Sequence, residues 1–313
     1  MLRIENLRKT YGNFVAVEGT TLTLEPGDVF GFIGPNGAGK TTTIKMIATL
    51  IQPTSGTVSI DGIDVVKHPL DVRPLLGYMP DFFGLYDDIK TWEYLDFFAA
   101  AYWIPKHERP AIIDSVLELT DLTEKRDAFV QSLSRGMQQR LCLAKCLVHD
   151  PKLLLLDEPA SGLDPRARVE IKALIAELGR MGKTVIVSSH ILPELADFCN
   201  KIGIMERGRI LVSGDVESIV RQLQPSRRLA IRTVGPLNGL RSAVESMEHV
   251  SAVDEEKDTL HVSFEGGLEE QAILLENLIH GGHKVCSFSE TSIDLEDVFM
   301  RVTTGAAAAA PQD

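Results

Sequence analysis

A glycine-rich loop near the N-terminus holds the first residues whose types and spacing suggest chemistry. In the stretch GFIGPNGAGKTTTIKMIATL, Gly34, Gly39, Lys40 and Thr41 follow the spacing G-x-x-x-x-G-K-[ST]. Glycines allow backbone N–H groups to turn inward around a phosphate, and the start of a following helix adds a positive dipole end. The spacing therefore predicts a loop that binds the phosphates of a nucleotide. The alternative, a glycine-rich turn with a structural role alone, is weakened by the elements on either side.

Those flanking elements have the pattern that a phosphate loop requires. Residues 28–33, DVFGFI, predict a short buried strand, and residues 41–51 predict a helix with apolar side chains at helical spacing. Between them, Lys40 would supply a mobile charge to the β- and γ-phosphates, and Thr41 would offer its hydroxyl to Mg²⁺. The predicted nucleotide-binding residues of the loop are Gly34, Pro35, Asn36, Gly37, Ala38, Gly39, Lys40, Thr41 and Thr42.

A second candidate group follows a run of leucines. The segment KLLLLDEP, residues 152–159, is typical of a central parallel strand that is buried on both faces. Asp157 and Glu158 would then lie at its carboxyl end, where open α/β sheets bind ligands. We expect Asp157 to hold Mg²⁺ through its water shell and Glu158 to polarise the attacking water. The alternative is an acidic pair that only ends a strand at the surface.

Further motifs make the chain resemble an ATP-binding cassette (ABC) ATPase. LSRGMQQR, residues 133–140, resembles the family's signature motif, and SGLD, residues 161–164, resembles its D-loop. VIVSSH ends in His190, at the place of the family's switch histidine, and Tyr11 stands where the family stacks an aromatic ring on adenine. The motifs occur in the family's order and cover about residues 2–215. A tyrosine or a histidine taken alone is more often a packing residue.

The resemblance implies a fold, a cofactor and a partner. The fold would be a P-loop core with a parallel sheet, an antiparallel β subdomain and an α-helical subdomain. Ser134 and Gly136 would open a helix whose N-terminus binds the γ-phosphate of ATP held by another protomer. Two chains would therefore enclose two ATP molecules head to tail, as a homodimer or with a close paralogue. Catalysis would rest on Glu158, His190 and Asp81, and Mg²⁺ on Thr41, Asp157 and Asp81.

Two departures from the family pattern bear on turnover. Asp81 stands in GYMPD where the family usually has a glutamine, and Arg135 and Met137 replace a glycine and a glutamine of the signature. The shorter, anionic Asp81 could still reach Mg²⁺ as an oxygen ligand, or it could leave coupling to a water molecule. Arg135 could add a charge-assisted contact to a triphosphate, or it could point outward.

An aromatic segment lies between Asp81 and the signature. Nine of the chain's 19 aromatic residues fall within residues 82–103, and Thr91 is predicted to cap a helix that runs through Tyr102. One interpretation is the core of a small helical subdomain. The other is a groove that receives a short helix from a membrane partner, because clustered aromatics mark interface anchors. Both interpretations can hold at once.

The cassette motifs end near residue 220, and a second domain follows. QPSRR, residues 224–228, is interpreted as a linker, and residues 226–303 show the order β-α-β-β-α-β, with an acidic turn at 254–258. This order predicts a small ferredoxin-like α+β domain. It resembles the C-terminal extension of ATPase subunits in type-2 ABC exporters, including drug-resistance pumps. Residues 304–313 predict a disordered tail.

Composition limits the classes of function. A formal charge of −12 over 313 residues disfavours nucleic acid as a partner. No apolar run approaches the ~18 residues that span a bilayer, and no secretory signal is evident. Cys142, Cys146, Cys199 and Cys286 form no C-x-x-C pair. Cys142 and Cys146, four residues apart on a predicted helix, are interpreted as small core residues.

The leading hypothesis is the ATP-hydrolysing subunit of an exporter, peripheral on the cytoplasmic face of the cell membrane, with a separate multi-span permease as its partner. One alternative is a soluble ABC ATPase that acts on nucleic acid or ribosomes. It is disfavoured by the single cassette, the charge and the lack of a long coiled coil. The other alternative is a non-hydrolysing ATP sensor that regulates a partner. The departures at Asp81 and Arg135 keep the sensor open, whereas Glu158 argues against it.

Overall fold

The computed structural model describes every residue except 83, 85, 87, 217, 220–226, 235, 236, 238 and 291–313. The chain divides into two compact units, Met1–Val216 and Glu217–Asp313, which are described separately. The predicted tail lies outside the described residues, as does most of the predicted boundary between the domains. Among the described residues, no helix is both long enough and apolar enough to cross a membrane.

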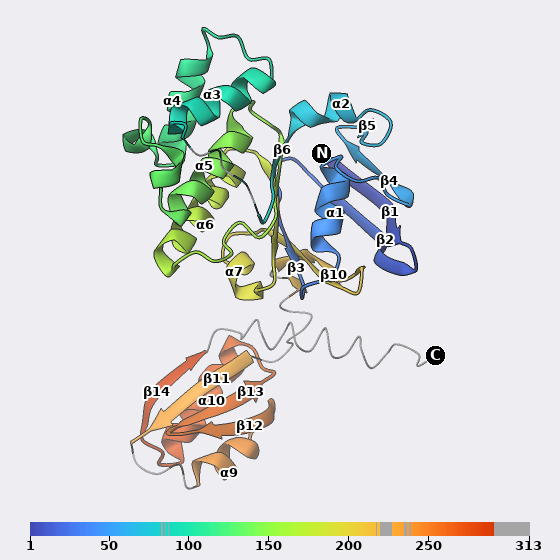
Figure 1. Ribbon diagram of the computed structural model, residues 1–313. Coiled ribbons are helices and arrows are strands. Elements are labelled where there is room, and N and C mark those ends of the chain that lie inside the picture. The colour runs from blue at the N-terminus through green and yellow to red at the C-terminus, as the bar shows by residue number, and fades with distance from the viewer. Residues whose placement is uncertain are drawn as a thin grey trace. The chain divides into compact units, whose positions relative to one another are not determined.

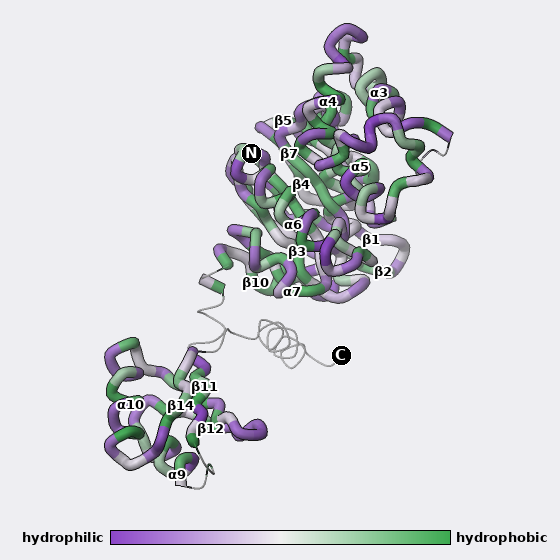
Figure 2. The backbone as a smooth tube through the Cα atoms, turned by 90° about the vertical axis from the view of Figure 1, so that its left-hand side faces the viewer, coloured by the Kyte–Doolittle hydropathy of each residue, from purple (hydrophilic) through white to green (hydrophobic). Residues whose placement is uncertain are grey.

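A six-stranded sheet with the order β10-β9-β3-β8-β7-β6 forms the centre of the first unit. All neighbouring pairs run parallel except β10 and β9, which are antiparallel. Every residue of β3 and β7 is buried, which is why their sequences are continuous apolar runs (Figure 2). The strands are β3 (Val29–Ile33), β6 (Leu76–Met79), β7 (Leu153–Leu156), β8 (Thr184–Ser189), β9 (Lys201–Glu206) and β10 (Arg209–Asp215).

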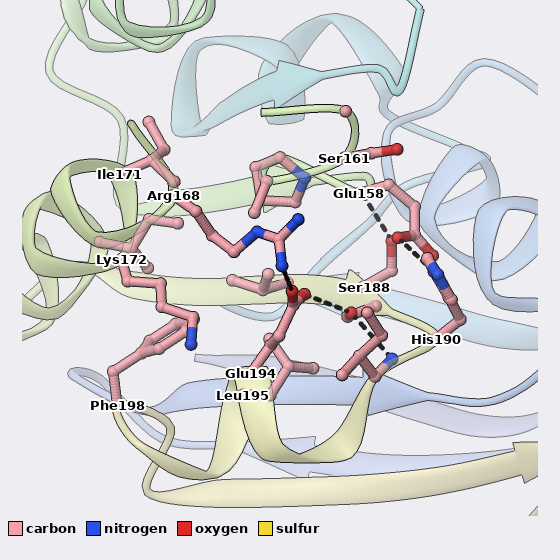
Figure 3. A pocket seen from close by; sticks show the side chains of 17 residues that line it. Glu158, Ser161, Arg168, Ile171, Lys172, Ser188, His190, Glu194, Leu195 and Phe198 are labelled. Carbon is pink, nitrogen blue, oxygen red and sulfur yellow. Dashed lines mark hydrogen bonds and ion pairs between the residues drawn. The ribbon is translucent and has the colours of Figure 1, made fainter. Parts of the chain in front are cut away.

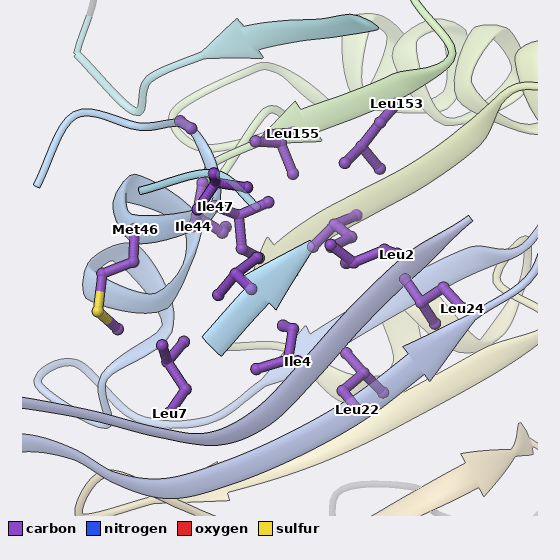
Figure 4. Packing of buried hydrophobic residues seen from close by; sticks show 14 of the residues in the cluster. Leu2, Ile4, Leu7, Leu22, Leu24, Ile44, Met46, Ile47, Leu153 and Leu155 are labelled. Atoms are coloured by element: carbon purple, nitrogen blue, oxygen red, sulfur yellow. The ribbon is translucent and has the colours of Figure 1, made fainter. Parts of the chain in front are cut away.

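A second, antiparallel sheet has the order β2-β1-β4-β5. Its strands are β1 (Leu2–Tyr11), β2 (Phe14–Leu24), β4 (Ser55–Ile60) and β5 (Ile63–Asp64). Helix α1 (Lys40–Ile47) joins the two sheets, because Ile44 and Ile47 pack in one buried cluster with Leu2 of β1 and Leu155 of β7 (Figure 4). This cluster fixes the start of α1, and with it the glycine-rich loop, against the sheet.

The helices of the first unit fall into groups. Figure 1 shows α3, α4 and α5 gathered on the other side of the six-stranded sheet from β1, β2 and β4. The helices after α1 are α2 (Pro69–Val72), α3 (Thr91–Ala101), α4 (Arg109–Leu119), α5 (Arg135–Leu147), α6 (Pro165–Arg180) and α7 (Leu192–Ala196). The parallel core, the antiparallel sheet and the helical group confirm the predicted architecture of this unit.

Two predictions about helix ends were wrong. Helix α1 ends at Ile47 rather than at residue 51, because Thr49 takes a left-handed φ of 62° that no α-helix continues. Helix α3 is capped by Lys90, whose backbone N–H donates to Glu93 Oε2 at 2.8 Å. The hydroxyl of Thr91 instead donates to the carbonyl of Ala128 at 3.1 Å.

The second unit contains one antiparallel sheet with the order β12-β13-β11-β14. Numbered within this unit, the strand order is 2-3-1-4, and with the β-α-β-β-α-β sequence of elements it confirms the predicted ferredoxin-like fold. One buried cluster joins the sheet to both helices. The elements are β11 (Arg227–Thr233), α9 (Leu240–Glu245), β12 (Val250–Glu256), β13 (Thr259–Phe264), α10 (Leu268–His280) and β14 (Val285–Glu290).

Two details of this unit differ from the sequence-based expectations. Arg227 and Arg228 open strand β11 and are not linker residues. Residues 254–256 belong to β12, so the turn is confined to Lys257 and Asp258. Cys286 is exposed, because it alternates along β14 with Val285, which packs against the cluster. Cys142 and Cys146 are buried, as expected, and Cys199 is buried as well.

Candidate active site

The glycine-rich loop between β3 and α1 has a backbone that only glycine allows at two positions. Gly39 has a φ of 107°, and a Cβ there would lie 2.5 Å from the carbonyl oxygen of Ala16. A Cβ on Gly34 would collide with the carbonyl oxygen of Met205. The loop therefore lies directly against β2 and β9, and it leads into the start of α1, where a helix favours an anion.

Lys40 lies inside this loop and is almost fully buried. Its Nζ donates to the carbonyl oxygens of Gly34 at 2.6 Å and Pro35 at 3.3 Å. The same Nζ lies 3.6 Å from Glu158 Oε1. Burial lowers the pKa of Lys40, and the nearby charges of Glu158 and Asp157 oppose that shift. The lysine is thus held where it links the loop to the end of β7.

Asp157 follows β7 and is 1% exposed. It accepts hydrogen bonds from Thr41 Oγ1 at 3.0 Å and from Ser188 Oγ at 2.6 Å. This arrangement of hard oxygen donors suits Mg²⁺, which keeps several waters and takes few protein ligands. Among the described residues, no three His, Cys, Asp or Glu side chains form a self-sufficient metal site. A cation here would need oxygens from water or from a phosphate as well.

Glu158 has the strained backbone of the site, with a φ of 49°. Its N–H donates to Ser188 Oγ at 2.9 Å, and its Oε2 lies 3.1 Å from His190 Nδ1. Burial raises the pKa of the Glu158 carboxyl, whereas the hydrogen bond from His190 and the charge of Lys40 pull that pKa down. The carboxylate is therefore desolvated and poised between two cationic or donor groups.

A cavity of about 230 Å³ lies in front of these groups. Its aromatic edge is formed by Tyr11 and Phe14, which are 49% and 62% exposed. The rest of the lining is Ala16, Asn36, Gly37, Ala38, Gly39, Lys40, Thr41, Thr42, Asp81 and Glu158. The structure thus brings Tyr11, most of the loop, Asp81 and Glu158 around one space, as expected from the sequence. An aromatic edge opposite a phosphate loop suits a nucleotide.

The residues of the signature motif lie outside this cavity. Ser134 caps α5, because its Oγ accepts from the N–H of Met137 at 3.4 Å. Neither Ser134 nor Gly136 lines the cavity of its own chain. The guanidinium group of Arg135 lies so close to Gly162 that a side chain at Gly162 would collide with it. Arg135 therefore packs on the SGLD segment of its own chain.

Sequence reasoning missed two residues of the site. Phe14 pairs with Tyr11 across the turn between β1 and β2, and it faces the same cavity. Its position three residues after Tyr11 was the available signal. Ser188 bridges Asp157 and the backbone of Glu158. Its place before His190 gave a weaker signal, because a serine that ends a strand is usually no more than a cap.

Comparison with known proteins identifies the family. The model of the family "ABC transporter" matches residues 17–161. The linearmycin resistance ATP-binding protein LnrL of Bacillus subtilis (strain 168) is 30% identical over 97% of this chain and 98% of its own length. A Nod factor export ATP-binding protein I of Cupriavidus metallidurans is 36% identical over 70% of this chain and 73% of its own.

The solved structures include similar cassettes. The dimeric structure of MJ0796, a bacterial ABC transporter cassette, is 25% identical over 69% of this chain and 99% of its own, with a TM-score of 0.62. The chain belongs to the ABC transporter family. It is an ATP-binding subunit that hydrolyses ATP to drive a membrane transporter.

Proposed function

We propose that the chain powers an exporter as a head-to-tail dimer with two ATP molecules and Mg²⁺ between its protomers. One observation carries the proposal: the cavity beside Lys40 and Glu158 is open and lacks the capped start of α5. The N–H groups near Ser134 suit an anion but have no phosphate loop of their own chain beside them. A second protomer would supply that helix start to the γ-phosphate.

In this dimer, the roles within one site are divided by position. Lys40 and the loop N–H groups would bind the β- and γ-phosphates, and Tyr11 would stack on adenine. Thr41, Asp157 and Asp81 would hold Mg²⁺, which neutralises phosphate charge when it is bound. Glu158 would orient and deprotonate water, and His190 would hold the Glu158 carboxylate in place.

The direction of transport is inferred from relatives. LnrL is named for linearmycin resistance and aligns along both units of this chain, including the ferredoxin-like one. The relative from Cupriavidus metallidurans is named for Nod factor export. Both names favour export, and we propose the cytoplasmic face of the cell membrane as the place where the chain works, peripherally and with a separate permease.

A groove of about 1030 Å³ is proposed as the docking site for that permease. It is lined by residues that follow α1, by α2 and β6, and by residues in or just after α3, α4 and α5. Trp103, which follows α3, and Leu70 line the groove and are 91% and 73% exposed. Tyr94 of α3, by contrast, is buried. The aromatic segment thus serves both as core of the helical group and as an apolar surface suited to a short amphipathic helix.

ATP-dependent dimerisation tests the proposal. Glu158→Gln protein is expected to shift from monomer to dimer mass in light scattering when ATP and Mg²⁺ are added. Lys40→Ala in the same background removes the phosphate contact and should stay monomeric. Ser134→Glu would place a negative charge at the start of α5 and should prevent the dimer while leaving ATP binding intact. A Ser134→Glu protein that still dimerises would contradict the head-to-tail arrangement.

A further inference from the structure

A second cavity, of about 200 Å³, lies behind the catalytic carboxylate and beneath the SGLD segment (Figure 3). Its lining includes Glu158 and His190 on one side and apolar residues of α6 and α7, such as Ile171 and Leu195, on the other. Arg168 of α6 crosses this space toward Glu194 of α7. Neither residue belongs to a motif that the sequence analysis assigned.

The two side chains join the SGLD segment to the loop that carries His190. Arg168 Nη1 lies 2.8 Å from Glu194 Oε1, and Arg168 Nη2 donates to the carbonyl oxygen of Leu163 at 3.5 Å. On the other side, Ser189 Oγ donates to Glu194 Oε2 at 3.3 Å and accepts from the N–H of Ile191 at 3.1 Å. The turn around His190 is therefore fixed through Glu194.

His190 depends on this turn for its orientation. Its side chain is 49% exposed, and its side-chain partner is the carboxylate of Glu158. Packing alone does not hold such an exposed ring, so the backbone of Ser189–Ile191 must direct it. Glu194 is only 14% exposed, which makes its pair with Arg168 stronger than an ordinary surface ion pair.

We propose that Arg168 and Glu194 are positioning residues for ATP hydrolysis. Their ion pair holds the SGLD segment and the His190 turn in one fixed relation, so that His190 meets Glu158 when ATP is bound. A change in the SGLD segment, which carries Ser161 and Leu163, then reaches His190 through two side chains. The inference rests on the proposed roles of Glu158 and His190.

The chain offers a matched control pair. Lys172, one turn along α6, lies 3.3 Å from Asp197, which directly follows α7. This pair joins the same two helices, but it forms no hydrogen bond or ion pair with the described residues Leu163 and Ser189. Loss of either pair should therefore loosen the packing of α6 and α7 to a similar extent. Only loss of the Arg168 pair should disturb the His190 turn.

The test measures steady-state ATP hydrolysis by the full chain with Arg168→Met, Glu194→Gln and both together. We expect kcat to fall ~10-fold or more, with the KM for ATP changed less than ~2-fold, because catalytic alignment is lost while the phosphate loop is intact. The double variant should be no slower than the slower single variant. Lys172→Met and Asp197→Asn should keep kcat within ~2-fold of the parent.

Equal loss of kcat in both pairs, or a KM that rises in step with the fall in kcat, would overturn the proposal. If Arg168→Met does not fold, the nearly isosteric Glu194→Gln decides alone, with thermal unfolding as its check. Glu158→Gln in the same assay separates a failure of the proposed roles of Glu158 and His190 from a failure of the positioning pair. Unchanged hydrolysis in Glu158→Gln would refute the proposed roles, whereas loss there with normal Arg168 and Glu194 variants would refute the positioning pair alone.

Discussion

His190 Nδ1 lies 3.1 Å from Glu158 Oε2, while the other carboxylate oxygen faces Lys40 at 3.6 Å. The carboxylate is therefore held from both sides by groups that come from different elements, the turn after β8 and the start of α1. Such a group can keep one orientation toward a water molecule placed at the γ-phosphate. The proposed chemistry depends on this orientation more than on any single contact.

Glu158→Gln should abolish hydrolysis but keep ATP binding. The amide retains the size of the carboxylate and its hydrogen bonding to His190, but it cannot accept a proton. We expect kcat to fall ~100-fold or more, the usual contribution of a general base. Phosphate release under saturating ATP measures the change, with Glu177→Gln on the surface of α6 as the control. Turnover at the parent rate would show that Glu158 is not the base.

Asp81→Ala should change the response to Mg²⁺. Asp81 lines the same cavity as Thr41 and Glu158. In the proposed site, its carboxylate would contribute one oxygen to the cation or its water shell. Loss of one such interaction, worth about 1 kcal/mol, should raise the Mg²⁺ concentration for half-maximal hydrolysis ~5-fold. Asp81→Gln, which restores the residue usual in the family, should retain much of the response. An unaltered Mg²⁺ titration in Asp81→Ala would show that Asp81 does not contribute to the metal site.

Tyr11→Ala should weaken ATP binding. A ring stacked on a base contributes about 1–3 kcal/mol, so the Kd for ATP should rise at least ~5-fold, with Tyr11→Phe close to the parent. Phe14→Ala is the informative comparison, since Phe14 lines the same edge of the cavity. Titration with a fluorescent ATP analogue measures each Kd. A large rise in the Kd for ATP in Phe14→Ala, with none in Tyr11→Ala, would show that adenine stacks on Phe14 and not on Tyr11.

Labelling with a thiol reagent should distinguish Cys286 from the other three cysteines. Burial raises the pKa of Cys146 to about 12, so that only ~10⁻⁴ of this thiol is ionised at pH 8. Cys142 and Cys199 are also buried, and burial raises the pKa of each thiol. In the native chain, a thiol reagent should therefore react rapidly with Cys286 alone, and Cys286→Ser should abolish that fast phase. Rapid labelling of a second thiol would contradict the burial described here.

Contiguous motifs allowed much of the site to be predicted from the sequence. Gly34, Lys40, Asp157 and Glu158 each belong to a short pattern whose strand and loop context can also be inferred from the sequence. The ferredoxin-like unit was predictable for the same reason, since alternating strands and capped helices are local signals. The expectation that Tyr11 stacks on adenine came only from the resemblance to a family.

Contacts between distant segments could not be predicted. Arg135 packs against Gly162, and Arg168 pairs with Glu194, only because the sheet brings separate loops to one edge. Neither pair has a spacing that a sequence pattern reveals. The end of α1 was also mispredicted, because the left-handed φ of 62° at Thr49 runs against the preference of a β-branched residue.

The most direct measurement is recovery of the permease. Tagged Glu158→Gln protein with ATP and Mg²⁺ should bring down a small multi-span protein from solubilised native membranes in about equal amount. Trp103→Asp in the same background should lose that protein while keeping the ATP-dependent dimer, because Trp103 lies in the groove and outside the nucleotide cavity. Recovery of soluble proteins alone, or equal recovery with Trp103→Asp, would contradict the account of a permease docked in this groove.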